Sequence, residues 1–394
     1  MAGRDRGRLR VVALVGLFAL LWWQTDVTLP GDLGAWRPDA LPGELVYDLA
    51  ELDGVVHAAA HTGLYVLDGP EPSEPYPDLP TPVVRLADDG RTWLVATGEG
   101  VHRLDTAGGS RPAGLQQERV NDLVHAEDRW LAATDTGVFE RVDDEWVRRW
   151  PADEEAQALT VAASSGRLLV GTRAGIVRLD PSDGSAETVW DGGIVRALFP
   201  DDRPGYEDRL WAGTVGDEVL LASEDEGRSW QRGGEGLRLL SAQDVRSHPG
   251  QPDRLVVGGT GVDDGELLGG VMVSDDGGST WDSEPNRLSN THVYRLAVDR
   301  EPLVVDVAWP LLARSSALEL PIDIARFRAA TNGAGVYTYA EPPAGLRLLA
   351  LLQPTVRVVE PLVAGAIFLA LLWQLARIGG PQATRRPDDP ARST

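Results

Sequence analysis

The stretch Trp130-Leu131-Ala132-Ala133-Thr134-Asp135-Thr136-Gly137-Val138-Phe139 contains two short apolar runs separated by a polar turn that ends at Gly137. Apolar runs of about 4–8 residues bounded by turn residues predict β-strands, because a helix needs a longer segment with a different period. The glycine supplies the backbone freedom of a tight turn. The stretch therefore predicts a β-hairpin.

This hairpin phrase recurs along most of the chain. Copies are found at residues 56–65, 93–101, 130–139, 168–176, 210–219, 255–271 and 327–337. The first six copies begin 37 to 45 residues apart, which is the length of a four-stranded propeller blade. Another short strand precedes the copies, as in Val46-Tyr47-Asp48-Leu49 and Val293-Tyr294-Arg295-Leu296. The sequence therefore predicts an all-β fold, a seven-bladed β-propeller over residues 36–341.

The two ends of this array predict how the ring closes. The last copy has no outer strand of its own after Tyr339, because Pro342 and Pro343 follow. A segment that begins at Trp36 precedes the first blade. We expect the Trp36 segment to be the outer strand of the last blade, which removes the exposed edge that an open ring would have.

Two turns share a more specific motif. Residues 223–230 (SEDEGRSW) and 274–281 (SDDGGSTW) both match the pattern S-x-D-x-G-x-[ST]-W. In such a turn the Ser and Asp side chains can bond backbone N–H groups, the Gly adopts a positive φ, and the Trp packs between strands. The residues expected to build these turns are Ser223, Asp225, Gly227, Trp230, Ser274, Asp276, Gly278 and Trp281.

On these two motifs the chain resembles the Asp-box, or bacterial neuraminidase repeat (BNR), family of propellers. That family includes sialidases, sortilin-type receptor domains and photosystem assembly factors. The resemblance covers about residues 36–341, although only two blades carry the complete motif. It implies that the turns are structural and lie at the outer rim. It does not carry sialidase activity over to this chain, because the early Arg-Ile-Pro signature of sialidases is missing and sialidases have six blades.

The chain is strongly acidic. It has 60 acidic residues against 37 basic ones, all of them Arg, and its net charge is −23. So many carboxylates favour a high-salt environment, where ions screen their mutual repulsion; an ordinary acidic protein with biased codons is the alternative. The negative field argues against a nucleic acid partner. The absence of Cys excludes disulfides, thiolate metal sites and Cys nucleophiles.

The N-terminus has the layout of a signal anchor. An Arg-rich tail over residues 1–10 precedes an apolar segment at 11–25, which contains the pair Trp22-Trp23 and is not followed by a small-residue cleavage site. Arginine before the segment favours a cytoplasmic tail, and tryptophan favours the membrane interface. We predict an uncleaved transmembrane helix; a cleaved signal peptide is the alternative.

The C-terminus has a similar pattern in reverse. An interfacial linker at 342–357 leads into an apolar segment at 358–376, and an Arg-containing tail at 377–394 follows. We predict a second transmembrane helix, with a buried or surface-lying helix as the alternative. Both termini are then cytoplasmic, and the propeller is extracytoplasmic at the cell membrane.

The last blade carries extra sequence at about 303–325, which begins with the apolar run from Leu303 to Leu312. We expect either an additional hairpin packed on the propeller or a hydrophobic tongue. A tongue would contact the membrane or a partner protein, since exposed apolar patches mark interfaces.

No pattern in the chain predicts catalysis. It has no zinc-protease motif, no phosphate-binding glycine loop and no Gly-x-Ser-x-Gly nucleophile, and its 6 His residues are scattered. Because acids are so numerous, a pair of carboxylates does not by itself identify a glycosidase. We expect a non-catalytic binding module or assembly scaffold for a protein or glycan partner, in contact with the lipid bilayer and without a metal or cofactor. An extracellular, sialidase-like glycoside hydrolase is the alternative.

Overall fold

The structure is a computed structural model. It describes residues 26–28, 30 and 32–342, with gaps at 53, 68–71, 74–75, 77, 106–108, 152–155, 202, 204, 264–265, 284–287, 289–291 and 310–313. The predicted transmembrane segments at 11–25 and 358–376, both tails and nearly all of the linker lie outside these residues. Among the described residues, no helix has the length and apolar character needed to cross a membrane.

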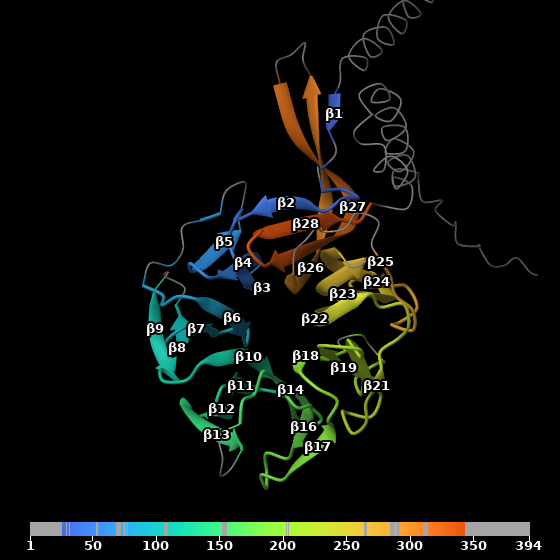
Figure 1. Cartoon of the computed structure of the whole chain (residues 1–394). Helices are drawn as coiled ribbons and strands as arrows, with labels where there is room; N and C mark the ends of the chain where they lie inside the picture. Colours follow the sequence, from blue (N-terminus) through green and yellow to red (C-terminus); the bar gives the residue numbers. More distant parts are fainter. Residues whose placement is uncertain are drawn as a thin grey trace, which may run out of the picture. The chain divides into compact units, whose positions relative to one another are not determined.

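The predicted seven-bladed propeller is confirmed (Figure 1). Seven antiparallel sheets follow one another along the chain, and in each blade the first strand is the innermost. The strands of blades 1 to 4 are β3 (Val46–Leu52), β4 (Val55–Ala60) and β5 (Leu64–Leu67); β6 (Val83–Asp88), β7 (Trp93–Thr97), β8 (Gly100–Leu104) and β9 (Ser110–Gly114); β10 (Val120–Ala126), β11 (Arg129–Thr134), β12 (Gly137–Val142) and β13 (Glu145–Trp150); and β14 (Thr160–Ser164), β15 (Arg167–Gly171), β16 (Ile176–Leu179) and β17 (Ala186–Trp190).

Blades 5 and 6 have the same four-stranded order, and blade 7 combines strands from both ends of the chain. Their strands are β18 (Val195–Pro200), β19 (Leu210–Thr214), β20 (Leu220–Ser223) and β21 (Gln231–Arg232); β22 (Leu239–His248), β23 (Gln251–Asp263), β24 (Glu266–Ser274) and β25 (Asp282–Ser283); and β26 (Val293–Trp309), β27 (Arg314–Thr331), β28 (Val336–Ala340) and β2 (Arg37–Ala40).

The recurring hairpin phrase forms the second and third strands of each blade. In blade 3 the Thr134 hydroxyl donates a hydrogen bond to the carbonyl of Gly137 at 3.1 Å, and Thr172 and Thr331 make the same bond in blades 4 and 7. Gly137 has φ 141°, and a Cβ there would lie 2.0 Å from the carbonyl oxygen of Trp150. The Thr and Gly of the phrase are therefore turn determinants.

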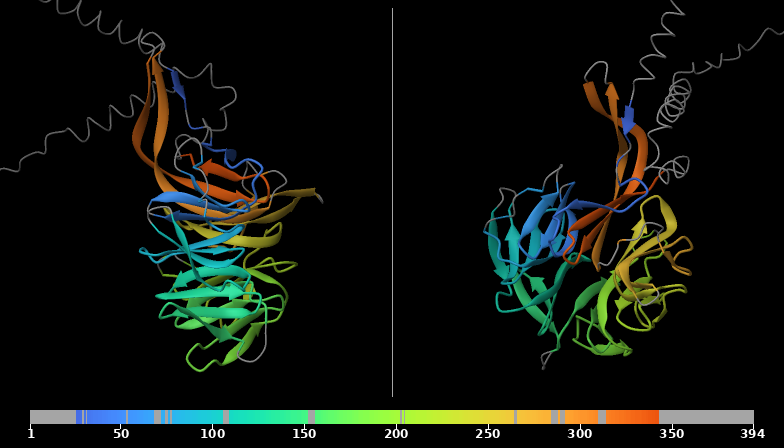
Figure 2. Two further views of the ribbon diagram at one scale, coloured as in Figure 1. Left: turned by 90° about the vertical axis from the view of Figure 1, so that its left-hand side faces the viewer. Right: turned by 45° about the horizontal axis from the view of Figure 1, so that its top comes forward.

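The hydrophobic core lies between neighbouring blades. One cluster joins Leu52 and Leu64 of blade 1 to Val83 and Val95 of blade 2, and a similar apolar cluster joins each later pair of blades around the ring. Figure 2 shows these twisted sheets lying against one another from two further directions. Because strand side chains alternate between the two faces of a sheet, each blade supplies apolar residues to both of its neighbours.

The predicted closure of the ring is also confirmed. Strand β2 pairs with β28, with Arg37 opposite Thr338 and Ala40 opposite Val336. The Trp36 ring is buried and stacks on Tyr339 with ring centroids 5.5 Å apart. The outer strand of the last blade therefore comes from the start of the propeller.

The chain divides into two compact units. The propeller unit is Gly31–Glu301 with Asp323–Pro343, and the other unit contains Met1–Pro30, Pro302–Ile322 and Ala344–Thr394. In the second unit, the short strand β1 (Asp26–Thr28) pairs with residues 306–308 of β26. The extra sequence predicted at 303–325 thus extends strands β26 and β27, and its contact with a membrane or a partner stays a prediction.

Candidate functional site

The innermost strands of the propeller unit enclose a central channel with a volume of about 680 Å³. Residues from the innermost strands of all seven blades line it: β3, β6, β10, β14, β18, β22 and β26. Because every blade contributes to this one surface, the channel is the natural candidate for a functional site.

A layer of charged side chains crosses the channel. We call it the ion-paired layer; its members are Asp48, Arg85, Asp122, Asp244, Arg246 and Arg295. Four of these residues, Asp48, Arg85, Asp122 and Asp244, directly follow a register shift in their strand. A β-bulge re-aims the side chain that follows it, which explains how the charged residues of these four innermost strands reach the axis.

One part of the layer joins blades 7, 1 and 2. The Arg295 Nε donates a hydrogen bond to Asp48 Oδ1 at 2.7 Å. The other oxygen of Asp48 accepts the backbone N–H of Leu86 at 2.9 Å. A single carboxylate therefore ties together the innermost strands of three blades.

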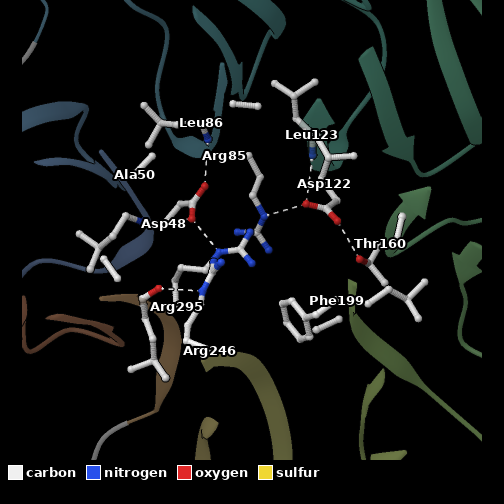
Figure 3. A pocket seen from close by; sticks show the side chains of 18 of the residues that line it. Asp48, Ala50, Arg85, Leu86, Asp122, Leu123, Thr160, Phe199, Arg246 and Arg295 are labelled. Atoms are coloured by element: carbon white, nitrogen blue, oxygen red, sulfur yellow. Dashed lines mark hydrogen bonds and ion pairs between the residues drawn. The ribbon is translucent and has the colours of Figure 1, made fainter. Parts of the chain in front are cut away.

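The next part of the layer joins blades 2, 3 and 4. The Arg85 Nε donates to Asp122 Oδ1 at 3.1 Å. The Thr160 hydroxyl donates to Asp122 Oδ2 at 2.7 Å (Figure 3). Asp122 thus repeats in blade 3 what Asp48 does in blade 1.

The third carboxylate of the layer joins blades 6 and 7. Asp244 Oδ2 accepts the backbone N–H of Leu296 at 2.7 Å and the Nε of Arg246 at 3.2 Å. Its other oxygen lies 3.9 Å from Arg295 Nη1 and has no hydrogen-bond donor within the described part of the chain. Ion pairs therefore join blades 6, 7 and 1, and a further ion pair joins blades 2 and 3. The hydrogen bond from the Leu86 N–H to Asp48 connects these two groups.

The aspartates of the layer are more deeply buried than its arginines. The Asp48, Asp122 and Asp244 side chains are 0–7% exposed, whereas those of Arg295, Arg85 and Arg246 are 15%, 21% and 38% exposed. Burial by itself would lower the pKa of Arg295, but the carboxylates of Asp48, Asp244 and Asp122 outweigh it and raise this pKa above its ordinary value. The Arg295 guanidinium therefore stays charged, and the three arginines form the more accessible surface of the layer.

Carboxylates collect at one end of the channel, where β3 and β6 end. Glu51 lies three residues after Asp48, Asp88 lies three residues after Arg85, and Asp299 lies four residues after Arg295. Burial raises the pKa of Asp299, the charge of Arg328 opposes the shift, and the neighbouring Glu51 raises the pKa further. The channel thus has guanidinium groups at one level and carboxylates at another.

The two turns that carry the S-x-D-x-G-x-[ST]-W motif lie outside the channel lining, after β20 and after β24. In the first turn the Ser223 hydroxyl accepts the N–H of Gly227 at 2.9 Å, and Asp225 accepts the N–H of Ser229 at 2.9 Å. In the second turn Ser274 accepts the N–H of Gly278 at 2.8 Å, and Asp276 accepts the N–H of Thr280 at 2.8 Å. The two turns are therefore built by the same hydrogen bonds.

The tryptophans of these turns differ in their surroundings. Trp281 is buried, donates a hydrogen bond to the Gly233 carbonyl at 2.9 Å and contacts Trp211 edge to face. Trp230 is half-buried, and its indole N–H has no acceptor within the described part of the chain. None of the eight motif residues lines the central channel.

Sequence reasoning missed the ion-paired layer, although its signal is present. The innermost strands of blades 7, 1, 2 and 3 read Val-Tyr-Arg-Leu, Val-Tyr-Asp-Leu, Val-Val-Arg-Leu and Val-Asn-Asp-Leu. The third residue therefore alternates between Arg and Asp in neighbouring blades. An alternation of charge at one register position could have predicted the pairing.

No protein-family model and no curated protein matches the chain. Solved structures resemble it in fold. The extracellular domain of BT4673 from B. thetaiotaomicron gives a TM-score of 0.56 at 12% identity, over 79% of this chain and 40% of that chain. YCF48 from Cyanidioschyzon merolae gives 0.54 at 11% identity, over 78% of this chain and 99% of that chain.

The WD40 β-propeller domain of Doa1 gives a TM-score of 0.51 at 11% identity, over 81% of this chain and 98% of that chain. The present chain spans less than half the length of the BT4673 structure. At these identities the similarities establish the propeller fold alone.

Proposed function

We propose that the chain is a non-catalytic binding module or assembly scaffold that is anchored in the cell membrane and presents its propeller to a protein or glycan partner outside the cytoplasm. The observation that carries this proposal is the engagement of the channel carboxylates. Asp48 and Asp244 each hold an arginine and a backbone N–H of the next blade, and Asp122 holds an arginine and the Thr160 hydroxyl of the next blade. A carboxylate used in this way cannot act as a nucleophile or acid without breaking contacts between blades.

Asp299, at the carboxylate end of the channel, is also engaged. It forms an ion pair with Arg328, and burial and the neighbouring Glu51 raise its pKa. A glycosidase needs two carboxyl groups that are free to act on the glycosidic bond. The engagement of Asp299 therefore supports binding over hydrolysis.

Two observations support the location. The apolar segments at 11–25 and 358–376 have arginines on the sides expected for cytoplasmic termini. The BT4673 propeller structure is that of an extracellular domain, although the likeness at 12% identity is one of fold. Epitope tags at the two ends of the full chain should be protected from protease in right-side-out vesicles, while the propeller is cleaved. Cleavage of either tag in sealed vesicles would contradict the topology.

Crosslinking in intact membranes at the native salt concentration tests the binding function. We expect a specific protein to be recovered with the tagged full chain, in an amount that excess untagged chain reduces. A tagged membrane protein of unrelated fold is the control. The proposal fails if the purified full chain instead releases product from chromogenic glycosides and Glu51→Gln abolishes that activity.

A further inference from the structure

The guanidinium groups of the ion-paired layer have more hydrogen-bond donors than acceptors. Arg85 uses its Nε on Asp122 and its Nη1 on two backbone carbonyls, and Arg246 uses only its Nε, on Asp244 and on the Leu296 carbonyl. Within the described part of the chain, Arg85 Nη2 and both terminal nitrogens of Arg246 donate to no protein atom. Each guanidinium offers five N–H donors, so several remain for a ligand.

These spare donors converge. Figure 3 shows the Arg85, Arg246 and Arg295 guanidinium groups gathered in the middle of the channel, with Asp48 and Asp122 on either side. Like charges collected at an axis repel one another, and a carboxylate that accepts from two guanidinium groups would relieve that repulsion. Arg196 also lines the channel, is exposed, and makes no ion pair with a described residue.

The end of the channel away from the ion-paired layer carries carboxylates and would attract a cationic group. Glu51 and Asp88 are exposed there, and Glu51 lies beside Asp299. Three residues of strand separate this level from the ion-paired layer, a distance of about 10 Å. Small apolar side chains, including those of Ala50, Ala87 and Val124, line the wall between the two levels.

We propose that the channel binds an elongated zwitterion, with a carboxylate against Arg196 and the arginines of the ion-paired layer and an ammonium or guanidinium group at Glu51, Asp88 and Asp299. This inference rests on the proposed binding function and names the ligand chemistry of the same channel. The free ends of peptides and small ω-amino acids both have this chemistry.

Isothermal titration of the purified full chain at constant salt tests the site with 8-aminooctanoate, whose extended length matches the separation of the two levels. We expect saturable 1:1 binding. Octanoate and octylamine each lack one charge and should bind at least about tenfold more weakly, the loss expected for one charge-assisted hydrogen-bonded contact. The shorter 4-aminobutanoate cannot reach both levels and should also bind weakly. Binding of Nα-acetylarginine would indicate that the ligand is a peptide C-terminus. If 8-aminooctanoate binds and Nα-acetylarginine does not, the ligand is a free small molecule.

Variants at each end separate the two contacts. Arg196→Gln and Glu51→Gln change exposed channel residues and should weaken 8-aminooctanoate about tenfold. Arg232→Gln and Glu187→Gln change exposed residues of the outer strands β21 and β17 and should leave the affinity unchanged. Equal affinity for octanoate, or no binding of any probe, would overturn the inference. If no probe binds but crosslinking still captures a partner, the inference of a zwitterionic channel ligand is wrong and the proposed binding function is retained.

Discussion

Aspartates of two kinds hold the propeller together, and they differ in what they connect. The inner aspartates, Asp48, Asp122 and Asp244, are buried at the axis and join one blade to the next. The outer aspartates, Asp225 and Asp276, are more accessible and close a turn within one blade. Both kinds bind backbone or hydroxyl hydrogens, but only the inner ones also hold an arginine of the ion-paired layer.

This difference determines how easily each kind of aspartate can be recognised in the sequence. An outer aspartate and all its partners lie within eight consecutive residues, as in 274–281, so the motif can be read in one line. An inner aspartate has its partners in other blades: Asp48 lies 247 positions from Arg295 and 38 positions from Leu86. Removing an inner aspartate should therefore disturb several blades, and removing an outer one should disturb a single hairpin.

The largest effect is expected for Asp48→Ala. The substitution leaves the guanidinium of Arg295 and the N–H of Leu86 without their acceptor at a site that excludes most water. Breaking a buried pair from one side costs about 3–5 kcal/mol, so the free energy of unfolding should fall by that amount in urea titrations. Asp191→Ala, at an exposed position in the turn before β18, is the control and should change it by less than about 0.5 kcal/mol. A loss from Asp48→Ala of about 2 kcal/mol or less would make the inner aspartate no more important for stability than an outer one.

The same contrast explains how far sequence alone could go. The blades, their number and the closure through β2 follow from period-2 strands, a fixed repeat and an unpaired Trp36 segment, all of which are local or periodic signals. The alternation of Asp48, Arg85 and Asp122 was visible, but its meaning depends on bulges that turn those side chains to the axis. The pair Asp244–Arg246 departs from the pattern, so only the structure could supply it.

A change in salt concentration should alter the contribution of the surface charges to stability more than that of the buried charges in the ion-paired layer. The net charge of −23 predicts repulsion across the surface, which ions screen over about 3 Å at 1 M salt and about 10 Å at 0.1 M. We expect the melting temperature of the full chain to fall by about 5–10 °C between these concentrations, a change of a few kcal/mol for a domain of this size. The loss caused by Asp48→Ala should change little, because buried pairs are screened less. A melting temperature that is flat or rises on desalting would refute the adaptation to high salt.

A smaller effect is expected for Asp276→Ala. This substitution removes the acceptor of the Thr280 N–H and of the Thr280 hydroxyl in the turn between β24 and β25. The turn is accessible to water, which can replace part of what is lost, so unfolding free energy should fall by about 1–2 kcal/mol. The neighbour Asp275 forms a surface ion pair with Arg254, and Asp275→Ala is a matched control expected to cost less than about 1 kcal/mol. Equal losses at the two positions would mean that the motif aspartate contributes only its charge.

The smallest expected effect is the pH dependence of the outer aspartate. The backbone N–H of Thr280, followed by its hydroxyl, holds the pKa of Asp276 below its usual value of about 3.8–3.9. A carboxyl whose folded pKa is lowered stabilises the fold above its unfolded pKa and loses that contribution as the pH falls through the folded pKa. The difference in unfolding free energy between the wild type and Asp276→Asn should therefore be constant above about pH 5 and shrink below about pH 4. Denaturant midpoints of the two proteins between those values, at one salt concentration, measure this difference. A gap that widened on acidification would show that the turn depends on the shape of the side chain instead of its charge.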